Sequence, residues 1–287
     1  MHPKDSILYV LRKSQAFLKD NGIESSRLDA ELLLSEVLNF NRVKLYTHFE
    51  YKLTEEQKDN YRKLLKERAK KVPIAYLTKK KNFYNSTFYV DPSVLIPRPE
   101  TEELVEWVLK DTPSIEEYTV LDLCTGSGCL GISLKRERPN WILHFSDLSM
   151  EALEVCKKNY FSIIEDDSFN NFYISDLFDS IPIKKFNLIT INPPYIPSTE
   201  KELLSAGVYE YEPHLALFLD HHEEFLTKLI KNLDNYIEDT GNLFMEIHPD
   251  WEPILKKIVL QSNKHIVFKK DYSNKIRMAK ISNELTQ

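Results

Sequence analysis

Cysteine is scarce in this chain of 287 residues, and the three that occur are Cys124, Cys129 and Cys156. They form no Cys-x-x-Cys pair and no Cys/His cluster with the ligand spacing of a zinc site. The adjacent His221 and His222 do not predict a metal site either, because neighbouring positions at one end of a helix point in different directions. We therefore expect reduced thiols and no bound metal.

Long hydrophobic runs are also missing. No stretch approaches the roughly 18 apolar residues of a membrane-spanning helix. Residues 1–10 carry charges, and their apolar run is too short for a signal peptide. A cytoplasmic location is therefore expected. The hydrophobic content of 42% is normal for a protein with a packed core, and the length allows one large or two ordinary domains.

Two common phosphate-binding fingerprints are absent. The glycines nearest to such a pattern are Gly126 and Gly128, in a Cys-Thr-Gly-Ser-Gly segment between an expected strand and an expected helix. This segment is not G-x-G-x-x-G, and it lacks the Gly-Lys-Ser/Thr of a P-loop. Glycines at such a turn still let the backbone approach a ligand, and the start of the following helix favours electron-rich groups.

Charge is unevenly distributed along the chain. Residues 1–98 hold 19 Lys and Arg against 12 Asp and Glu, a net +7, whereas the remainder holds 19 against 32, a net −13. This asymmetry predicts two domains with different roles. The basic part could meet RNA or an acidic partner, with ordinary solvated charge as the alternative, and the acidic part argues against a nucleic-acid groove across its own face.

The two parts also differ in their hydrophobic pattern. Residues 1–72 have the periodicity and caps of a small helical bundle, including a capping box from Thr54 to Gln57. Residues 73–98 read as a β-hairpin linker with its turn near Asn85. From residue 99 to 287, strands and helices alternate, which indicates an α/β domain with a mainly parallel sheet. The expected strands are residues 120–123, 141–145, 171–175, 186–191, 242–247, 265–270 and 275–281, the last two as a hairpin that adds an antiparallel strand.

Polar side chains follow several of the expected strands. Asp147 follows the second strand, where a carboxylate can accept both hydroxyls of a ribose, although such a residue is also a common helix cap. Asp176 follows the third strand and Asn192 the fourth. Because ligands bind at the carboxyl edge of open α/β sheets, this convergence predicts a binding site there.

The fourth strand stops at Asn192-Pro193-Pro194-Tyr195. Two prolines remove two backbone donors and fix φ, and the residue before a proline is held extended. The Asn192 side-chain oxygen and the Pro193 carbonyl then form a planar pair of acceptors beside the ring of Tyr195, which suits a planar NH2 group. The alternative is a proline-rich turn after a core strand. Arg98, held between two prolines just before a helix, could face the same ligand or a partner.

Together these motifs resemble the glutamine-N5 protein methyltransferases of the PrmC/HemK type, which modify peptide chain release factors. The similarity covers nearly the whole chain, and its landmarks are residues 29–34, 96–102, 122–128, 146–147, 192–195, 212–213 and 216–217. The resemblance implies a Rossmann-like class I methyltransferase fold with a mixed seven-stranded sheet. It also implies S-adenosyl-L-methionine as cofactor, a release factor as the protein substrate recognised by the helical domain, and a monomer.

The resemblance assigns roles to residues of this sequence. Catalysis would rest on Asn192, Pro193 and Tyr195. The cofactor would be held by Asp122, Thr125, Gly126, Ser127, Gly128, Asp147, Leu148, Asp176, Leu177, Asn192 and Arg98. Two segments depart from the family pattern, residues 218–222 and 248–251.

Three other interpretations are weighed against this one. Adenine-N6 methyltransferases of nucleic acids share the Asn-Pro-Pro-Tyr element, but they need a basic groove, which the acidic second part disfavours. The ribosomal-protein glutamine methyltransferases share most of the fold. A non-enzymatic binding module is the third alternative, and the intact cofactor motifs argue against it.

Overall fold

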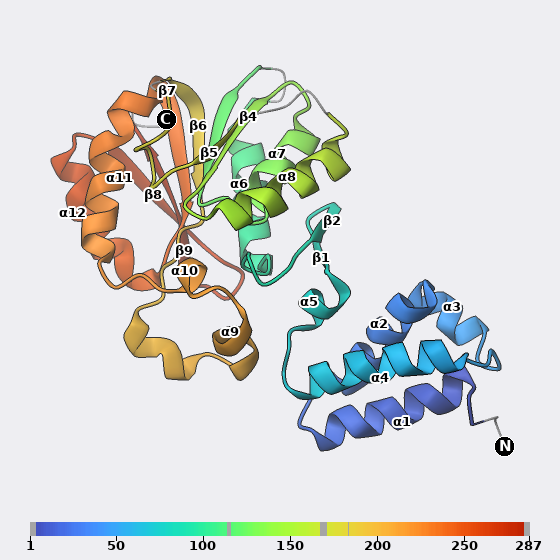
Figure 1. Cartoon of the computed structure of the whole chain (residues 1–287). Coiled ribbons are helices and arrows are strands. Elements are labelled where there is room, and N and C mark those ends of the chain that lie inside the picture. Colours follow the sequence, from blue (N-terminus) through green and yellow to red (C-terminus); the bar gives the residue numbers. More distant parts are fainter. Residues whose placement is uncertain (1–3, 114–115, 167–170, 183, 284–287) are drawn as a thin grey trace. The chain divides into compact units, whose positions relative to one another are not determined.

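The computed structural model describes residues 4–113, 116–166, 171–182 and 184–283 (Figure 1). The chain forms two compact units. The first contains Met1–Lys80 together with Ser205–Tyr211, and the second contains Lys81–Leu204 and Glu212–Gln287. No helix in the described ranges is both long enough and apolar enough to span a membrane.

The first unit is helical, as predicted. Its helices are α1 (Ile7–Asp20), α2 (Ser26–Leu38), α3 (Arg42–Thr47), α4 (Glu55–Ala69) and α5 (Ile74–Thr78). Their apolar faces meet in one cluster around Leu33 and Leu34, both fully buried. The predicted capping box is confirmed, because the Thr54 and Gln57 side chains each accept a hydrogen bond from the other's backbone N–H. Helix α5 was not predicted, and Pro73 lies at its N-cap.

A short segment from the second half of the sequence completes the first unit. Residues Ser205–Tyr211 include helix α9 (Ala206–Tyr211), and the Tyr211 hydroxyl donates to the Lys70 carbonyl oxygen at 2.9 Å. The units therefore differ from the predicted division into residues 1–72, 73–98 and 99–287 in two respects. The helical unit extends to Lys80, and it recruits this later segment.

The predicted β-hairpin is present. Strands β1 (Lys80–Phe83) and β2 (Ser86–Tyr89) pair with each other, and Tyr84 between them has a left-handed φ of 51°. The Asn159 side chain accepts from the Tyr89 N–H at 2.7 Å and donates to the Tyr89 carbonyl at 3.0 Å, so β2 is held against helix α8 (Met150–Ile164). The hairpin thus packs largely within the second unit.

The second unit is built on a seven-stranded sheet in the order β5-β4-β3-β6-β7-β9-β8. The strands are β3 (Thr119–Leu123), β4 (Ile142–Asp147), β5 (Phe172–Ile174), β6 (Phe186–Ile191), β7 (Ile237–Glu246), β8 (His265–Lys270) and β9 (Ile276–Ser282). Neighbours from β5 to β7 pair in parallel, whereas β9 pairs antiparallel with both β7 and β8. This confirms the predicted mixed sheet and the antiparallel strand contributed by the last hairpin.

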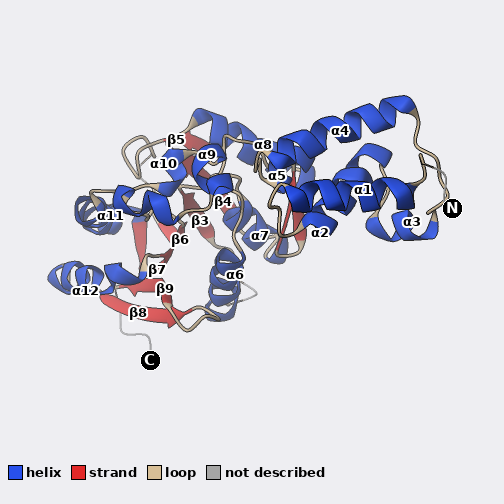
Figure 2. Cartoon of the chain, turned by 90° about the horizontal axis from the view of Figure 1, so that it is seen from below, coloured by secondary structure: helices blue, strands red, loops and turns tan. Residues whose placement is uncertain are grey.

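Helices cover both faces of this sheet (Figures 1 and 2). Helices α6 (Pro99–Asp111), α7 (Cys129–Glu137) and α8 lie on one face, and α11 (His222–Tyr236) and α12 (Glu252–Gln261) lie on the other. Each layer has its own apolar core, centred on Leu188 and Phe145 on the α6–α8 side and on Ile189 and Leu229 on the α11–α12 side. Helix α12 was not predicted. The shorter elements are η1 (Ser198–Leu203), α10 (His214–Leu217) and η2 (Pro249–Trp251).

Strand alternation places a row of polar side chains at the carboxyl ends of three adjacent strands. The α6–α8 core includes Val120, Leu188 and Phe244 from strands β3, β6 and β7. Because side chains on one face recur every second residue, the next positions on that face are Asp122, Thr190 and Glu246. All three are buried. The strand order reverses between β3 and β6, and such a switch point is where open α/β sheets bind ligands.

Candidate active site

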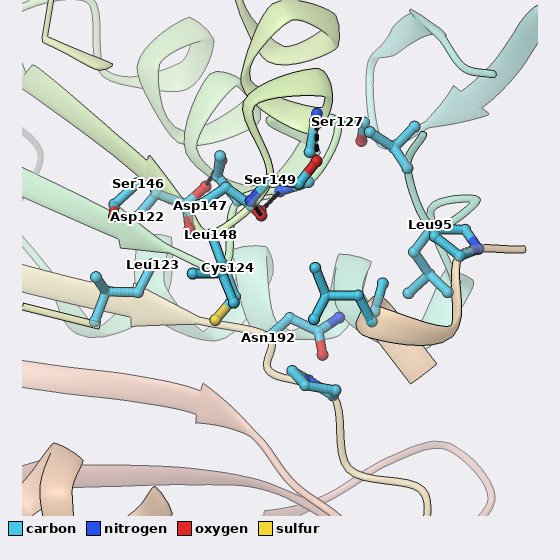
Figure 3. Close-up of a pocket in the computed structure, with 18 of the residues that line it drawn as sticks. Leu95, Asp122, Leu123, Cys124, Ser127, Ser146, Asp147, Leu148, Ser149 and Asn192 are labelled. Atoms are coloured by element: carbon cyan, nitrogen blue, oxygen red, sulfur yellow. Dashed lines mark hydrogen bonds between the residues drawn. The ribbon is translucent and has the colours of Figure 1, made fainter. Parts of the chain in front are cut away.

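A cavity of about 270 Å³ opens at the carboxyl ends of β3, β4 and β6. It is lined by most of the predicted site residues, namely Arg98, Asp122, Thr125, Gly126, Ser127, Asp147, Leu148, Asp176, Leu177 and Asn192. Figure 3 labels Asp122, Ser127, Asp147, Leu148 and Asn192 among them. Three predicted residues, Gly128, Pro193 and Tyr195, are not among the residues that line it. The carboxyl edge of the sheet thus brings together residues from five separate stretches of sequence.

The turn from β3 into α7 forms one wall of this cavity. Cys124, Gly126 and Gly128 all have positive φ angles, of 52°, 53° and 79°. A Cβ atom added to Gly126 would meet no atom within 4 Å, so this glycine faces open space. The buried Asn159 side chain supports the turn from below, since its NH2 group donates to the Ser127 carbonyl at 2.8 Å.

Gly128 has a packing role, and its predicted contact with the ligand stays a prediction. A Cβ at this position would lie 2.6 Å from Ile132 Cδ1 and 2.7 Å from Cys156 Sγ, so the start of α7 can approach α8 only if residue 128 has no side chain. The same reasoning applies to Gly131, which sequence reasoning missed. Its Cβ would lie 2.5 Å from Phe145 Cε1, and its N–H donates to Asp122 Oδ2 at 3.2 Å.

These contacts predict different costs for two alanine substitutions. Both Gly126→Ala and Gly128→Ala force a left-handed φ on a residue with a Cβ, which costs about 1–2 kcal/mol. Gly128→Ala adds the clash with Ile132 and Cys156, so we expect its free energy of unfolding to fall by a further ~1–3 kcal/mol. Urea unfolding of the two variants measures the difference. Equal stabilities would contradict this assignment of Gly128.

Asp147 holds the two loops that border the cavity. Its Oδ2 accepts from the Gly126 N–H at 2.8 Å, and its Oδ1 accepts from the Ser149 N–H at 3.0 Å (Figure 3). Burial raises the pKa of the Asp147 carboxyl, and these backbone hydrogen bonds oppose the rise. Ser149 is the N-cap of α8, because its Oγ accepts from the Ala152 N–H at 3.1 Å. Because Ser149 caps the helix, Asp147 is available to a ligand.

Asp122 lies at the floor of the cavity and is held by three donors. Its Oδ2 accepts from the Thr125 hydroxyl at 2.6 Å and from the Gly131 N–H, and its Oδ1 accepts from the Thr190 hydroxyl at 2.8 Å. Burial raises the pKa of Asp122 to about 6, although these three hydrogen bonds act to lower it. A positively charged group in the cavity would therefore favour the ionised form of Asp122.

The far side of the cavity is an apolar slot with one acid at its rim. Leu148, Leu177 and Phe225 line it, and Leu177 is fixed in a left-handed conformation with a φ of 51°. Asp176, at the rim, pairs with Lys228 of helix α11 at 2.8 Å. Such a slot fits a flat, mostly apolar ring system with a polar edge.

Arg98 lines the cavity and is held by an ion pair. Its Nη2 lies 2.7 Å from Glu212 Oε1, and the Glu212 side chain is almost completely buried. The other oxygen, Oε2, accepts from the Ile96 N–H at 3.1 Å. Glu212 therefore fixes the loop before α6, and Arg98 is oriented by it.

The Asn192 side chain enters the cavity from the end of β6 (Figure 3). Its Nδ2 donates to the Thr101 hydroxyl at 3.1 Å, and that hydroxyl donates to Glu246 Oε2 at 2.7 Å. The Tyr195 hydroxyl donates to the other oxygen, Glu246 Oε1, at 3.0 Å. Burial raises the pKa of Glu246, while the Thr101 and Tyr195 hydroxyls and the nearby Arg277 oppose the rise. Tyr195 is thus anchored in the protein interior, and it does not line the cavity.

The two segments that depart from the family pattern meet beside Tyr195. His222 and Trp251 stack with their ring centroids 6.0 Å apart, and Trp251 contacts the Tyr195 ring edge-on at 6.4 Å. The backbone after Tyr195 is also held, because Ile196 donates to the Leu217 carbonyl and accepts from the Leu219 N–H. The two segments therefore pack against each other beside Tyr195.

Thr101 and Glu246 are the site residues that sequence reasoning missed. Neither was assigned a role in the site. A signal was present for Glu246, which ends a buried strand at the same edge as Asn192, where a carboxylate needs partners.

The cysteines near the cavity are not nucleophiles. Cys124 and Cys129 line it and Cys156 is buried next to Gly128. Burial raises the pKa of the Cys129 thiol to about 12, and it raises the pKa values of Cys124 and Cys156 as well. All three stay protonated at neutral pH, so thiolate chemistry is disfavoured here.

Comparison with known proteins gives matches over both units. A model of the PrmC N-terminal domain matches residues 10–78, and a model of the methyltransferase small domain matches residues 101–206. The chain is 51% identical over 279 residues to the release factor glutamine methyltransferase of Leptospira interrogans, covering 96% of this chain and 97% of the relative. It is 34% identical over 266 residues to that of Rhodopirellula baltica, covering 90% and 88%. It is 36% identical over 225 residues to that of Koribacter versatilis, covering 78% and 79%.

Proposed function

Because the chain belongs to the family of release factor glutamine methyltransferases, we propose that it methylates the side-chain amide nitrogen N5 of a glutamine in a peptide chain release factor. The methyl donor is S-adenosyl-L-methionine. The observation that carries this proposal is the Asn192 amide, which enters a cavity at the switch point of the sheet and is held there by Thr101. An amide oxygen fixed in this way accepts a hydrogen bond from the NH2 group of a carboxamide.

The cavity fits the cofactor in both shape and chemistry. The open space beside Gly126 admits the methionine moiety of the cofactor. The carboxylate oxygens of Asp147 have lone pairs beyond those used by the backbone, and these can accept from the ribose hydroxyls. The slot between Leu148 and Leu177 suits the adenine ring, with Asp176 at its polar edge. When bound, S-adenosyl-L-methionine supplies an electrophilic methyl group on a sulfonium centre.

The residues around Asn192 compensate for a poor nucleophile. The nitrogen of a glutamine side chain attacks weakly, because its lone pair is delocalised into the carbonyl group. Asn192 Oδ1 and the Pro193 carbonyl each accept one of its N–H bonds, which orients the nitrogen and raises its electron density. Positioning and fixed dipoles therefore supply most of the rate. The nitrogen is cationic after methyl transfer, so its proton then leaves without a dedicated base.

Asp122 makes cofactor binding depend on pH. Its pKa lies at about 6, above the ordinary 3.8, so the carboxyl gains a proton as the pH falls through 6. The methionine ammonium of the cofactor favours the ionised form of Asp122, and it stays mostly protonated from pH 5 to pH 7.5. We therefore expect the affinity for the cofactor to fall below pH 6, by up to about tenfold for each pH unit.

Calorimetric titration at pH 5 and pH 7.5 measures this change. The pKa of Asp147 is also raised, so the Asp122→Asn variant isolates the share that belongs to Asp122. The variant should bind more weakly at pH 7.5 and lose most of the pH dependence. If the wild type bound equally well at both pH values, Asp122 would have no electrostatic role toward the cofactor.

The helical unit is the part that docks the release factor. This unit, residues 1–80 and 205–211, holds 17 Lys and Arg against 12 Asp and Glu, a net +5, which suits an acidic partner surface, whereas the rest of the chain is acidic. The protein acts as a monomer in a cytoplasmic setting, where its protein substrate is made.

A side-by-side transfer assay tests the proposal. The protein is given cofactor with a labelled methyl group and either an unmodified release factor, the same factor with its acceptor glutamine replaced by alanine, or adenine-containing DNA. We expect label only in the unmodified factor. Label in DNA, or equal label in both forms of the factor, would contradict the proposed substrate.

A further inference from the structure

The Asn192 amide has two edges, and only one of them serves the reaction. Its oxygen accepts a hydrogen bond from an incoming NH2 group, whereas its own NH2 edge would repel that group. A half-turn about the last side-chain bond exchanges the two edges at almost no steric cost, because O and NH2 have similar sizes. We propose that Glu246 and Thr101 are positioning residues that fix this orientation, so that Asn192 Oδ1 faces the acceptor nitrogen. This inference rests on the proposed function of the site.

The direction of each hydrogen bond follows from the Glu246 carboxylate. The Thr101 and Tyr195 hydroxyls and the nearby Arg277 favour its ionised form. In that form both its oxygens are acceptors, and they take the hydroxyl hydrogens of Thr101 at 2.7 Å and Tyr195 at 3.0 Å. A hydroxyl has a single hydrogen, so the Thr101 oxygen, having given its hydrogen to Glu246, can only accept from Asn192. The edge of Asn192 that lies 3.1 Å from Thr101 must therefore be its NH2 group.

The reversed orientation is disfavoured by the same contacts. Turning the amide would bring Asn192 Oδ1 against the Thr101 oxygen, two acceptors with no hydrogen between them. Thr101 is 1% exposed and Glu246 is fully buried, so water does not relieve this contact. A buried acceptor pair of this kind lowers the population of the reversed amide by roughly tenfold to a hundredfold.

Packing alone gives no reason for a carboxylate at position 246. Glu246 follows Phe244 on that face of β7 and pairs with Met278 of β9. Both neighbours are apolar and buried, so an apolar side chain would fill the space without the cost of burying a charge. A carboxylate can accept a hydrogen bond from both hydroxyls at once. It thereby determines the direction of each hydrogen bond from Asn192 through Thr101 to Glu246. Glu246 does not line the cavity, so it acts through Thr101.

Thr101→Val tests this inference, because valine keeps the volume of threonine and removes its hydroxyl. We expect kcat to fall by about tenfold, the effect of one lost hydrogen bond, with the dissociation constant of the cofactor unchanged within about twofold by calorimetry. Thr101→Ser, which keeps the hydroxyl, should recover most of the rate. Thr112→Val is the matched control, since Thr112 is a buried threonine just after the other end of α6 whose hydroxyl bonds only to the Val108 carbonyl among the described contacts. It should leave kcat unaltered.

A double-substitution experiment separates positioning from a general structural role. If Thr101 acts only through Asn192, then adding Thr101→Val to the Asn192→Ala variant lowers the remaining rate by less than about twofold. The full tenfold loss in both backgrounds would overturn the inference, as would a Thr101→Val variant with the wild-type kcat.

Nuclear magnetic resonance gives a readout that does not depend on turnover. The side-chain NH2 signals of Asn192, assigned by their loss in Asn192→Ala, should exchange slowly with water in the wild type and faster in Thr101→Val. Equal exchange in the two proteins would contradict the inference. Failure of the proposed function can be told apart from failure of this inference. It would appear as absence of methylated release factor in the wild-type reaction of the same series.

Discussion

Replacing Asn192 by alanine should lower the rate of methyl transfer by at least about a hundredfold, equivalent to ~3 kcal/mol of transition-state stabilisation. The substitution removes one of the two acceptors that hold the carboxamide nitrogen, while Asp122, Gly126 and Asp147 keep their contacts. Cofactor affinity should therefore stay close to that of the wild type. Single-turnover kinetics with labelled cofactor measures the rate, and calorimetry measures the affinity.

Asn187→Ala is the matched control for this experiment. Asn187 lies at the opposite end of β6 and accepts from the Thr119 N–H through its side-chain oxygen at 2.8 Å. Its loss should lower stability without lowering the rate of methyl transfer at a temperature where the protein stays folded. An Asn192→Ala variant as active as the Asn187→Ala control would remove Asn192 from the mechanism.

The second large effect is expected for Asp147→Ala, and it concerns affinity. A hydrogen bond to a charged group contributes about 1.5–3 kcal/mol, so losing the ribose contact should weaken cofactor binding by about 10- to 100-fold. The Gly126 N–H also loses its acceptor, which loosens the turn that borders the cavity. Calorimetric titration with the cofactor measures the change.

Asp179→Ala controls for the loss of one acidic side chain near the same edge of the sheet. Asp179 is partly exposed and pairs with Lys228 at 2.8 Å, and it does not line the cavity. Its removal should leave the dissociation constant unchanged within about twofold. If Asp147→Ala bound the cofactor as tightly as this control, the ribose assignment would be wrong.

Much of the second unit could be predicted from its pattern of residues. Residues 186–191 and 265–270 were predicted as strands with the bounds that the structure has, because each apolar or β-branched run ends at a clear signal. Local signals define these elements, so the sequence is sufficient for them.

The elements that were missed depend on tertiary contacts. Helix α5 has only five residues and begins after Pro73, where the local signal favours a break. Segment Ser205–Tyr211 joins the helical unit through bonds such as that from Tyr211 to Lys70, and no local pattern predicts such a partner. Long-range contacts of this kind are not encoded in short-range periodicity.

The same distinction separates the two parts of the site. Asp147 and Asn192 could be identified because each follows a strand and therefore lies at the carboxyl edge of the sheet. The roles of Thr101 and Glu246 could not, because they depend on α6 and β7 meeting at hydrogen-bond distance. The packing role of Gly128 could not be predicted either, because it depends on the contact with Cys156, which lies on another helix.

A structure of the protein with S-adenosylhomocysteine and a glutamine-containing peptide is the most direct test of the central claim. We expect the carboxamide nitrogen to lie about 2.7–3.2 Å from both Asn192 Oδ1 and the Pro193 carbonyl oxygen. We also expect the Asn192 NH2 group still to donate to the Thr101 hydroxyl oxygen. A complex in which either oxygen points away from the acceptor nitrogen would contradict the claim.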